Sequence, residues 1–76
     1  MSEYVSKAFM VLVHIPVENG LPQRESFVVG CATREEAEAK ISRLYSPEQN
    51  ISMFALALSS FETEQLELSE GEIRRW

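Results

Sequence analysis

The stretch Ala8–Val17, AFMVLVHIPV, decides the fold of this chain. Valine, isoleucine and phenylalanine dominate it, which favours a β-strand from about Val5 to Val17. From Phe9 to Val17 one alternating set of side chains is entirely apolar, and the other set is apolar from Ala8 to Leu12 and then reaches His14. The pattern therefore predicts a strand that is covered on both faces for most of its length.

A second strand is predicted over Glu25–Ala32, a run that is rich in valine. The intervening segment Pro16–Pro22 is dense in turn formers, and Asn19-Gly20 can supply the positive φ that a tight reversal needs. We expect a hairpin that joins the two strands across this loop.

The sequence Thr33-Arg-Glu-Glu36 has the pattern of a capping box, in which a hydroxyl and a carboxylate bond the first amides of a helix. A helix is predicted from Arg34 to about Tyr45, and Pro47 ends it because proline disfavours helical geometry in the preceding residue. Spacings of three and four residues give the helix one apolar stripe. The stripe consists of Ala37, Ile41, Leu44 and Tyr45.

A third strand is predicted over Ile51–Ser59, and both of its alternating sets are again apolar. Beyond it, Ser69-Glu-Gly-Glu72 has the pattern of another capping box and predicts a short helix that carries Trp76. Residues Thr63–Leu68 fit either a helical turn or a short edge strand.

These elements predict one α+β domain over residues 1–76, with a small antiparallel or mixed sheet of three or four strands. The order is β-β-α-β-(α), and the helix packs on one face of the sheet. The other face is apolar as well, so either Ser60–Trp76 or a second copy of the chain must cover it. We favour the second copy, and hence a homodimer, because Ser60–Trp76 is short and acidic.

Twelve acidic residues against seven basic ones give the 76-residue chain a net charge of −5. This balance disfavours binding to nucleic acids and to anionic membranes. The longest apolar run is too short to span a bilayer, and the start MSEYVSK lacks a signal-peptide pattern, so we expect a soluble cytoplasmic protein. One cysteine and one histidine fall short of a structural zinc site, and no metal or cofactor is expected.

Two residues are candidates for catalysis, and each has a simpler interpretation. Cys31 precedes the predicted helix, where amide dipoles can activate a thiol, but a small buried hydrophobe is the interpretation we favour. His14 is the single histidine of the chain, and histidine often acts in acid–base catalysis, although a histidine at a strand end is usually a structural or surface residue.

Arg24 and Arg34, together with Arg43, are candidates for an anion site near the start of the first helix. The turn before that helix lacks the glycines and the lysine of a phosphate-binding loop. Five glutamates of the C-terminal third suggest paired catalytic carboxylates or a cation site: Glu62, Glu64, Glu67, Glu70 and Glu72. The chain contains no aspartate, however, and a solvated acidic face explains them better.

The C-terminal residues Arg74, Arg75 and Trp76 are the candidates for partner binding, since arginine and tryptophan are enriched at interface hot spots. Docking against the sheet is the alternative role for Trp76.

Three classes of function fit the sequence. The one we favour is a small, self-associating protein-interaction module without catalytic activity. The second is a small enzyme or ligand-binding protein with its site at a dimer interface, which would require His14 beside a carboxylate or Cys31. The third is an acidic regulator that imitates nucleic acid and would need the glutamates of Glu62–Glu72 in one ordered row.

Overall fold

The computed structural model describes residues 4–76, and within them it contains a four-stranded antiparallel sheet and two helices. The order is β-β-α-β-α-β, which confirms the expected α+β class. The elements are β1 (Phe9–Ile15), β2 (Gln23–Val29), α1 (Arg34–Ser42), β3 (Ser52–Ala57), α2 (Ser60–Leu66) and β4 (Ile73–Arg75). The first three residues of the MSEYVSK stretch lie outside the described part of the chain.

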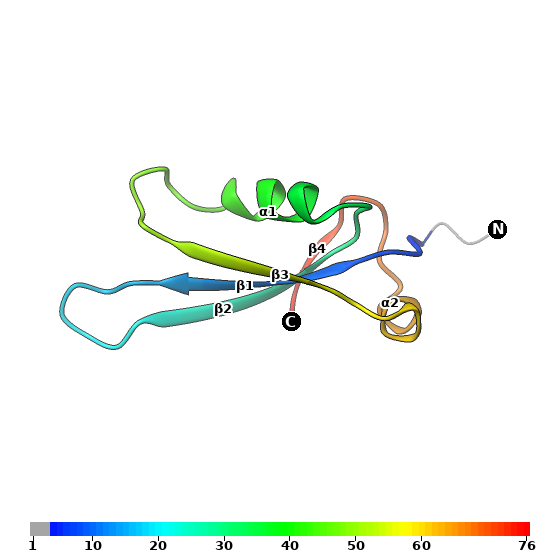
Figure 1. Ribbon diagram of the computed structural model, residues 1–76, viewed down its shortest axis with the longest axis horizontal. Helices are drawn as coiled ribbons and strands as arrows, with labels where there is room; N and C mark the ends of the chain where they lie inside the picture. The colour runs from blue at the N-terminus through cyan, green and yellow to red at the C-terminus, as the bar shows by residue number, and fades with distance from the viewer. Residues whose placement is uncertain (1–3) are drawn as a thin grey trace.

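The strands lie in the order β3-β1-β2-β4, and each neighbouring pair is antiparallel (Figure 1). β1 and β2 form the predicted hairpin, with Phe9 opposite Val29 and Ile15 opposite Gln23. Neither Asn19 nor Gly20 has a positive φ, so the sequence-based expectation for this turn is wrong. A loop of this length can reverse the chain through ordinary backbone conformations.

α1 packs on one face of the sheet, as predicted, and this face holds the larger core. Side chains alternate along a strand, so the odd-numbered residues of β1, β2 and β3 point towards α1. The buried members of this core are Val11, Val13, Phe27, Val29, Cys31, Ala37, Ile41 and Ala55. Tyr45 packs at the margin of this core, whereas Leu44 is exposed and was wrongly included in the apolar stripe.

The opposite face of the sheet is covered at one end only. A smaller cluster there has Ala8, Val28 and Leu68 as its buried members, and Leu66 of α2 packs against it. α2 therefore lies on the other side of the sheet from α1 (Figure 1). Of the two predicted ways to cover this face, the C-terminal segment accounts for one end, and the other end stays open.

The helix and the first strand are shorter than predicted. Thr33 caps α1, because its Oγ1 accepts a 3.2 Å hydrogen bond from the amide of Glu36. The helix ends at Ser42 rather than Tyr45, since the amide of Tyr45 bonds the carbonyl of Ser42 in a tighter turn. Val5 does not extend β1, because its amide bonds the carbonyl of Leu68 instead.

The C-terminal helix predicted from Ser69 is absent, and β4 takes its place. Gly71 has a φ of 79°, and its amide bonds the carbonyl of Gly30, which pairs this segment with the end of β2. Residues Thr63–Leu68, for which two structures were open, belong mostly to α2. A capping box between Ser59 and Glu62 begins that helix, and sequence analysis had assigned Ser59 to the third strand.

Candidate interaction surface

The uncovered end of the second face is a patch of side chains that we call the open floor. It follows from the register, because residues opposite one another on neighbouring strands point to the same side. Leu12 is opposite both Phe54 and Ser26, and the amide of Trp76 bonds the carbonyl of Ser26, so these four residues form one row. The whole open floor consists of Leu12, His14, Arg24, Ser26, Ser52, Phe54, Leu56 and Trp76.

The open floor exposes large apolar side chains. The exposed fractions are 39% for Leu12, 59% for Phe54, 39% for Leu56 and 58% for Trp76. A contiguous apolar patch of this kind is typical of an interaction surface, whereas single exposed apolar residues are ordinary.

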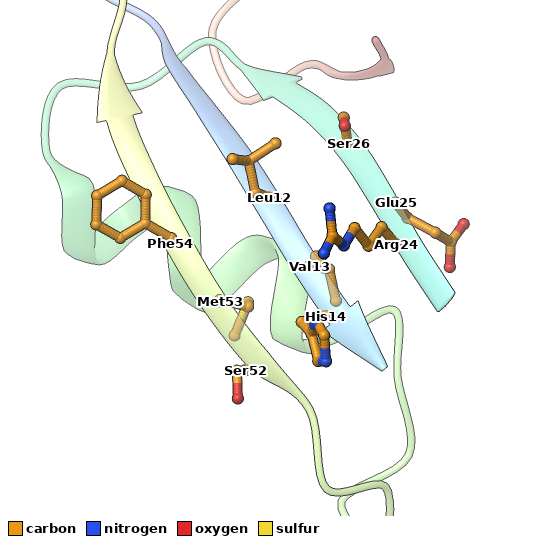
Figure 2. A pocket seen from close by; sticks show the side chains of 9 residues that line it. All are labelled: Leu12, Val13, His14, Arg24, Glu25, Ser26, Ser52, Met53 and Phe54. Atoms are coloured by element: carbon orange, nitrogen blue, oxygen red, sulfur yellow. The ribbon is translucent and has the colours of Figure 1, made fainter. Parts of the chain in front are cut away.

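A hollow of about 350 Å³ lies in the open floor, and Leu12, His14, Arg24 and Phe54 are among its lining residues. Figure 2 shows the side chain of Arg24 extending from β2 over β1, with the guanidinium between Leu12 and His14. The side chain of Glu25 points the other way (Figure 2), and its carboxylate accepts a 2.9 Å hydrogen bond from the Tyr45 hydroxyl. The hollow thus combines an apolar base with a cation.

Charge is distributed unevenly between the open floor and the rest of the chain. Within residues 4–76, the strands contribute no carboxylate side chain to the open floor, and Arg24 makes no ion pair. Glu25, its neighbour in β2, belongs to the α1 side and pairs with Arg75. The open floor is therefore neutral to positive on an acidic protein.

The neighbouring edge of the sheet is also open. β3 is an outer strand, and its residues SMFALA include neither a charge nor a proline. Edge strands of this kind can pair with a strand of another chain.

The three C-terminal candidates lie in different environments. Arg74 donates hydrogen bonds to Glu72 and to the carbonyl of Leu66, so it ties β4 to α2. Arg75 pairs with Glu25 on the other face and lies 5.6 Å from the centre of the Phe27 ring. Of the three, Trp76 alone is an exposed apolar group on the open floor.

The structure does not bring His14 and Cys31 together. His14 is opposite Arg24, and Cys31 lies seven residues further along the chain, past the other end of β2. At about 3.3 Å per residue, the two side chains are roughly 20 Å apart. Among residues 4–76, Glu25 is the one carboxylate that lines the hollow of His14, and its side chain points away from the hollow (Figure 2). A histidine–cysteine pair within one chain is therefore excluded.

Cys31 is buried in the larger core, and its Sγ donates a 3.3 Å hydrogen bond to the carbonyl of Thr33. Burial raises the pKa of this thiol above its ordinary value, and the carboxylate of Glu36 acts in the same direction. The hydrogen bond to Thr33 and the charge of Lys40 oppose these effects without reversing them. Burial thus restricts the access of a reagent to the thiol, and the raised pKa reduces the share of reactive thiolate.

We expect a thiol reagent at neutral pH to label native Cys31 at least about a hundred times more slowly than the unfolded chain, because labelling requires the core to open. The control is a Cys31→Ala variant that also carries Ala39→Cys, which moves the single thiol to an exposed position of α1. Native labelling as fast as this control would revive the nucleophile interpretation.

The remaining candidates are scattered. Arg34 begins α1 on the other side of the sheet from Arg24, so the two do not form one anion site. The carboxylate of Glu62 accepts hydrogen bonds from the amide and the hydroxyl of Ser59 at the start of α2, and Glu72 pairs with Arg74. Glu64 and Glu67 line one hollow, and Glu70 lines another. The five glutamates therefore do not share one surface hollow.

Within residues 4–76, no three histidine, cysteine or acidic side chains come close enough to hold a metal ion. Neither helix in this part of the chain has the length and apolarity to cross a bilayer. Comparison with models of protein families, with curated proteins and with solved structures found no match.

Sequence analysis missed one exposed aromatic residue, which lies on α2. Phe61 lies in the first turn of α2, within a segment that was left without an assignment. The pattern Ser59-x-x-Glu62 was the available signal, because it places the start of a helix immediately before Phe61.

Proposed function

We propose that this chain is a small protein-interaction module without catalytic activity, and that its open floor associates with a second copy of the chain. One observation carries the proposal: Leu12, Phe54, Leu56 and Trp76 form an exposed apolar patch on a sheet whose other face is already covered by α1. Two-fold association is the commonest way in which such a patch is buried. The lone cysteine fits a reducing compartment, and we place the module in the cytoplasm.

The size of the chain supports the same proposal. A domain of this length buries a smaller share of its surface than a large domain does, and it gains stability from a partner subunit. No disulfide can supply that stability within the chain, because Cys31 is the single cysteine.

The test is the oligomeric state of the full chain. We expect light scattering at micromolar concentration to give twice the mass of one chain, and a single chain's mass after dilution. Leu12→Glu should raise the dimer dissociation constant about a hundredfold, because it buries a carboxylate at the centre of the interface in both copies. In the separated chain this carboxylate stays hydrated, since Leu12 is partly exposed there.

The matched control is Leu21→Glu, which makes the same change in the hairpin loop, where the side chain is 90% exposed. This variant should dimerise as the natural chain does. A natural chain that stays folded at the mass of one chain up to high micromolar concentration would overturn the proposal. Leu56→Glu, at another position of the open floor, gives an independent repeat of the test.

A further inference from the structure

The end of the second face that α2 covers stands higher than the open floor. Leu66 packs on this end of the face, and a helix with its side chains is about 10 Å across, so α2 rises beside the open floor as a step. Two open floors could not meet if the steps of the two copies lay at the same end. They can meet if the two copies run in opposite directions, so that the step of each copy lies over the open floor of the other. A two-fold axis produces this arrangement.

The surface that α2 presents to such a partner follows from its helical geometry. Thr63 is buried and Leu66 packs on the sheet, so these residues mark the inner side of the helix. Phe61 lies roughly opposite both of them around the helix at 100° per residue, and it is 70% exposed. Glu64 is three residues further on and exposed, on the flank of α2 next to Phe61, where it also lines a hollow with Val5 and Ser6. Phe61 and Glu64 thus form a ridge on α2, and the ring of Phe61 points away from the chain's own sheet.

The ridge and the hollow are complementary in chemistry. The hollow offers Leu12 and Phe54 as apolar contacts and the guanidinium of Arg24 as a cation beside them. The ridge offers an aromatic ring with a carboxylate one turn away. Within residues 4–76 neither Arg24 nor Glu64 makes an ion pair inside its own chain. Each charge is therefore available to a partner.

We propose that α2 of each copy inserts Phe61 into the hollow of the other copy and pairs Glu64 with the partner's Arg24. This inference rests on the proposed self-association and specifies the contacts that make it. The contact occurs twice in the dimer, because the two-fold axis repeats it. It explains why an aromatic residue is exposed on a helix whose inner side is already packed against the sheet.

The first test removes the aromatic ring. We expect Phe61→Ala to raise the dimer dissociation constant about tenfold or more, because aromatic side chains in a central pocket are frequent hot spots. The substitution removes two such rings from each dimer, one from each copy of the chain. The matched control is Leu44→Ala, which removes an exposed apolar side chain near the end of α1 on the far side of the sheet. This control should leave the dissociation constant unchanged.

The second test exchanges the charges. Arg24→Glu and Glu64→Arg should each weaken the dimer severalfold, and the double variant should recover most of the loss. Arg43→Glu changes the net charge as Arg24→Glu does, but at an exposed position after α1, and it should have no effect. Arg24, Glu64 and Phe61 are all exposed, so these variants are expected to fold.

The outcomes separate this inference from the proposed function. A dimer that Leu12→Glu disrupts but Phe61→Ala and the charge exchange leave intact would overturn the insertion of α2 and leave self-association standing. A dimer that is unaffected by all three changes would associate through another surface, such as the edge of β3, and would contradict both this inference and the open floor as the interface. A natural chain that never dimerises would overturn both proposals.

Discussion

Leu68→Ala is expected to lower the free energy of unfolding by about 3 kcal/mol, because it removes most of a fully buried side chain from a small cluster. Leu68 has no exposed surface, and Ala8 and Val28 are the other buried members of that cluster. A chain of 76 residues has a total stability of roughly 4–11 kcal/mol, so the variant loses a large share of it.

Urea unfolding followed by circular dichroism measures this effect, at one fixed concentration because association adds to the apparent stability. Leu21→Ala is the control, since the same atoms are removed from a side chain in contact with water, and it should cost less than about 0.5 kcal/mol. A loss below 1 kcal/mol for Leu68→Ala would contradict the packing of α2 and its following segment against the sheet.

Gly30→Ala is the second change with a large expected effect, and we expect it to cost about 3 kcal/mol. A Cβ at this position would lie 2.6 Å from the carbonyl oxygen of Ser69 and 3.0 Å from Cγ2 of Val5. The two backbones cannot separate easily, because the amide of Gly30 bonds Glu72 and its carbonyl accepts from Gly71. Relief of the clash would require these hydrogen bonds to break.

The matched control is Gly20→Ala in the hairpin loop. There the nearest atom to the added Cβ is Cγ1 of Val17 at 3.8 Å, and the backbone has no positive φ. This substitution should leave the stability unchanged or raise it slightly, because alanine restricts the unfolded chain. Equal unfolding midpoints for the two alanine variants would argue against the close approach at Gly30.

The sheet could be predicted from the sequence because β1, one of its two inner strands, is apolar on both sides. Val11 and Val13 lie against α1, whereas Leu12 lies on the open floor, as strict alternation requires. The ends of the strands could not be predicted, because partners distant in the sequence determine them. Val5 is a residue type that favours strands, yet its amide donates a hydrogen bond to the carbonyl of Leu68, and β1 does not extend to it.

Two identical patterns, Ser59-x-x-Glu62 and Ser69-x-x-Glu72, had opposite outcomes. In both, the glutamate carboxylate accepts a hydrogen bond from the serine amide. The first pattern begins α2, but the second forms a reverse turn, because Gly71 adopts a positive φ and pairs with Gly30. The local pattern reports only that a helix can start, and the long-range pairing with β2 decides the result.

The candidate site was predictable in part. His14 and Arg24 face each other once the hairpin is known, because equal numbers of residues separate them from its loop. The position of Trp76 in the open floor could not be predicted, since it depends on β4, which sequence analysis had interpreted as a helix. Glu25 accepts a hydrogen bond from Tyr45 and forms an ion pair with Arg75. Both interactions depend on the packing of α1 and β4, and no local sequence pattern indicates them.

The most direct test of self-association through the open floor uses the fluorescence of Trp76, the single tryptophan of the chain. Its side chain is exposed in one copy and lies in the same row as Leu12 and Phe54. We predict that its emission maximum moves to shorter wavelength as concentration rises, in parallel with a doubling of the mass, and that Leu12→Glu abolishes both changes. An emission maximum that stays that of a water-exposed tryptophan while the mass doubles would contradict the open floor as the interface.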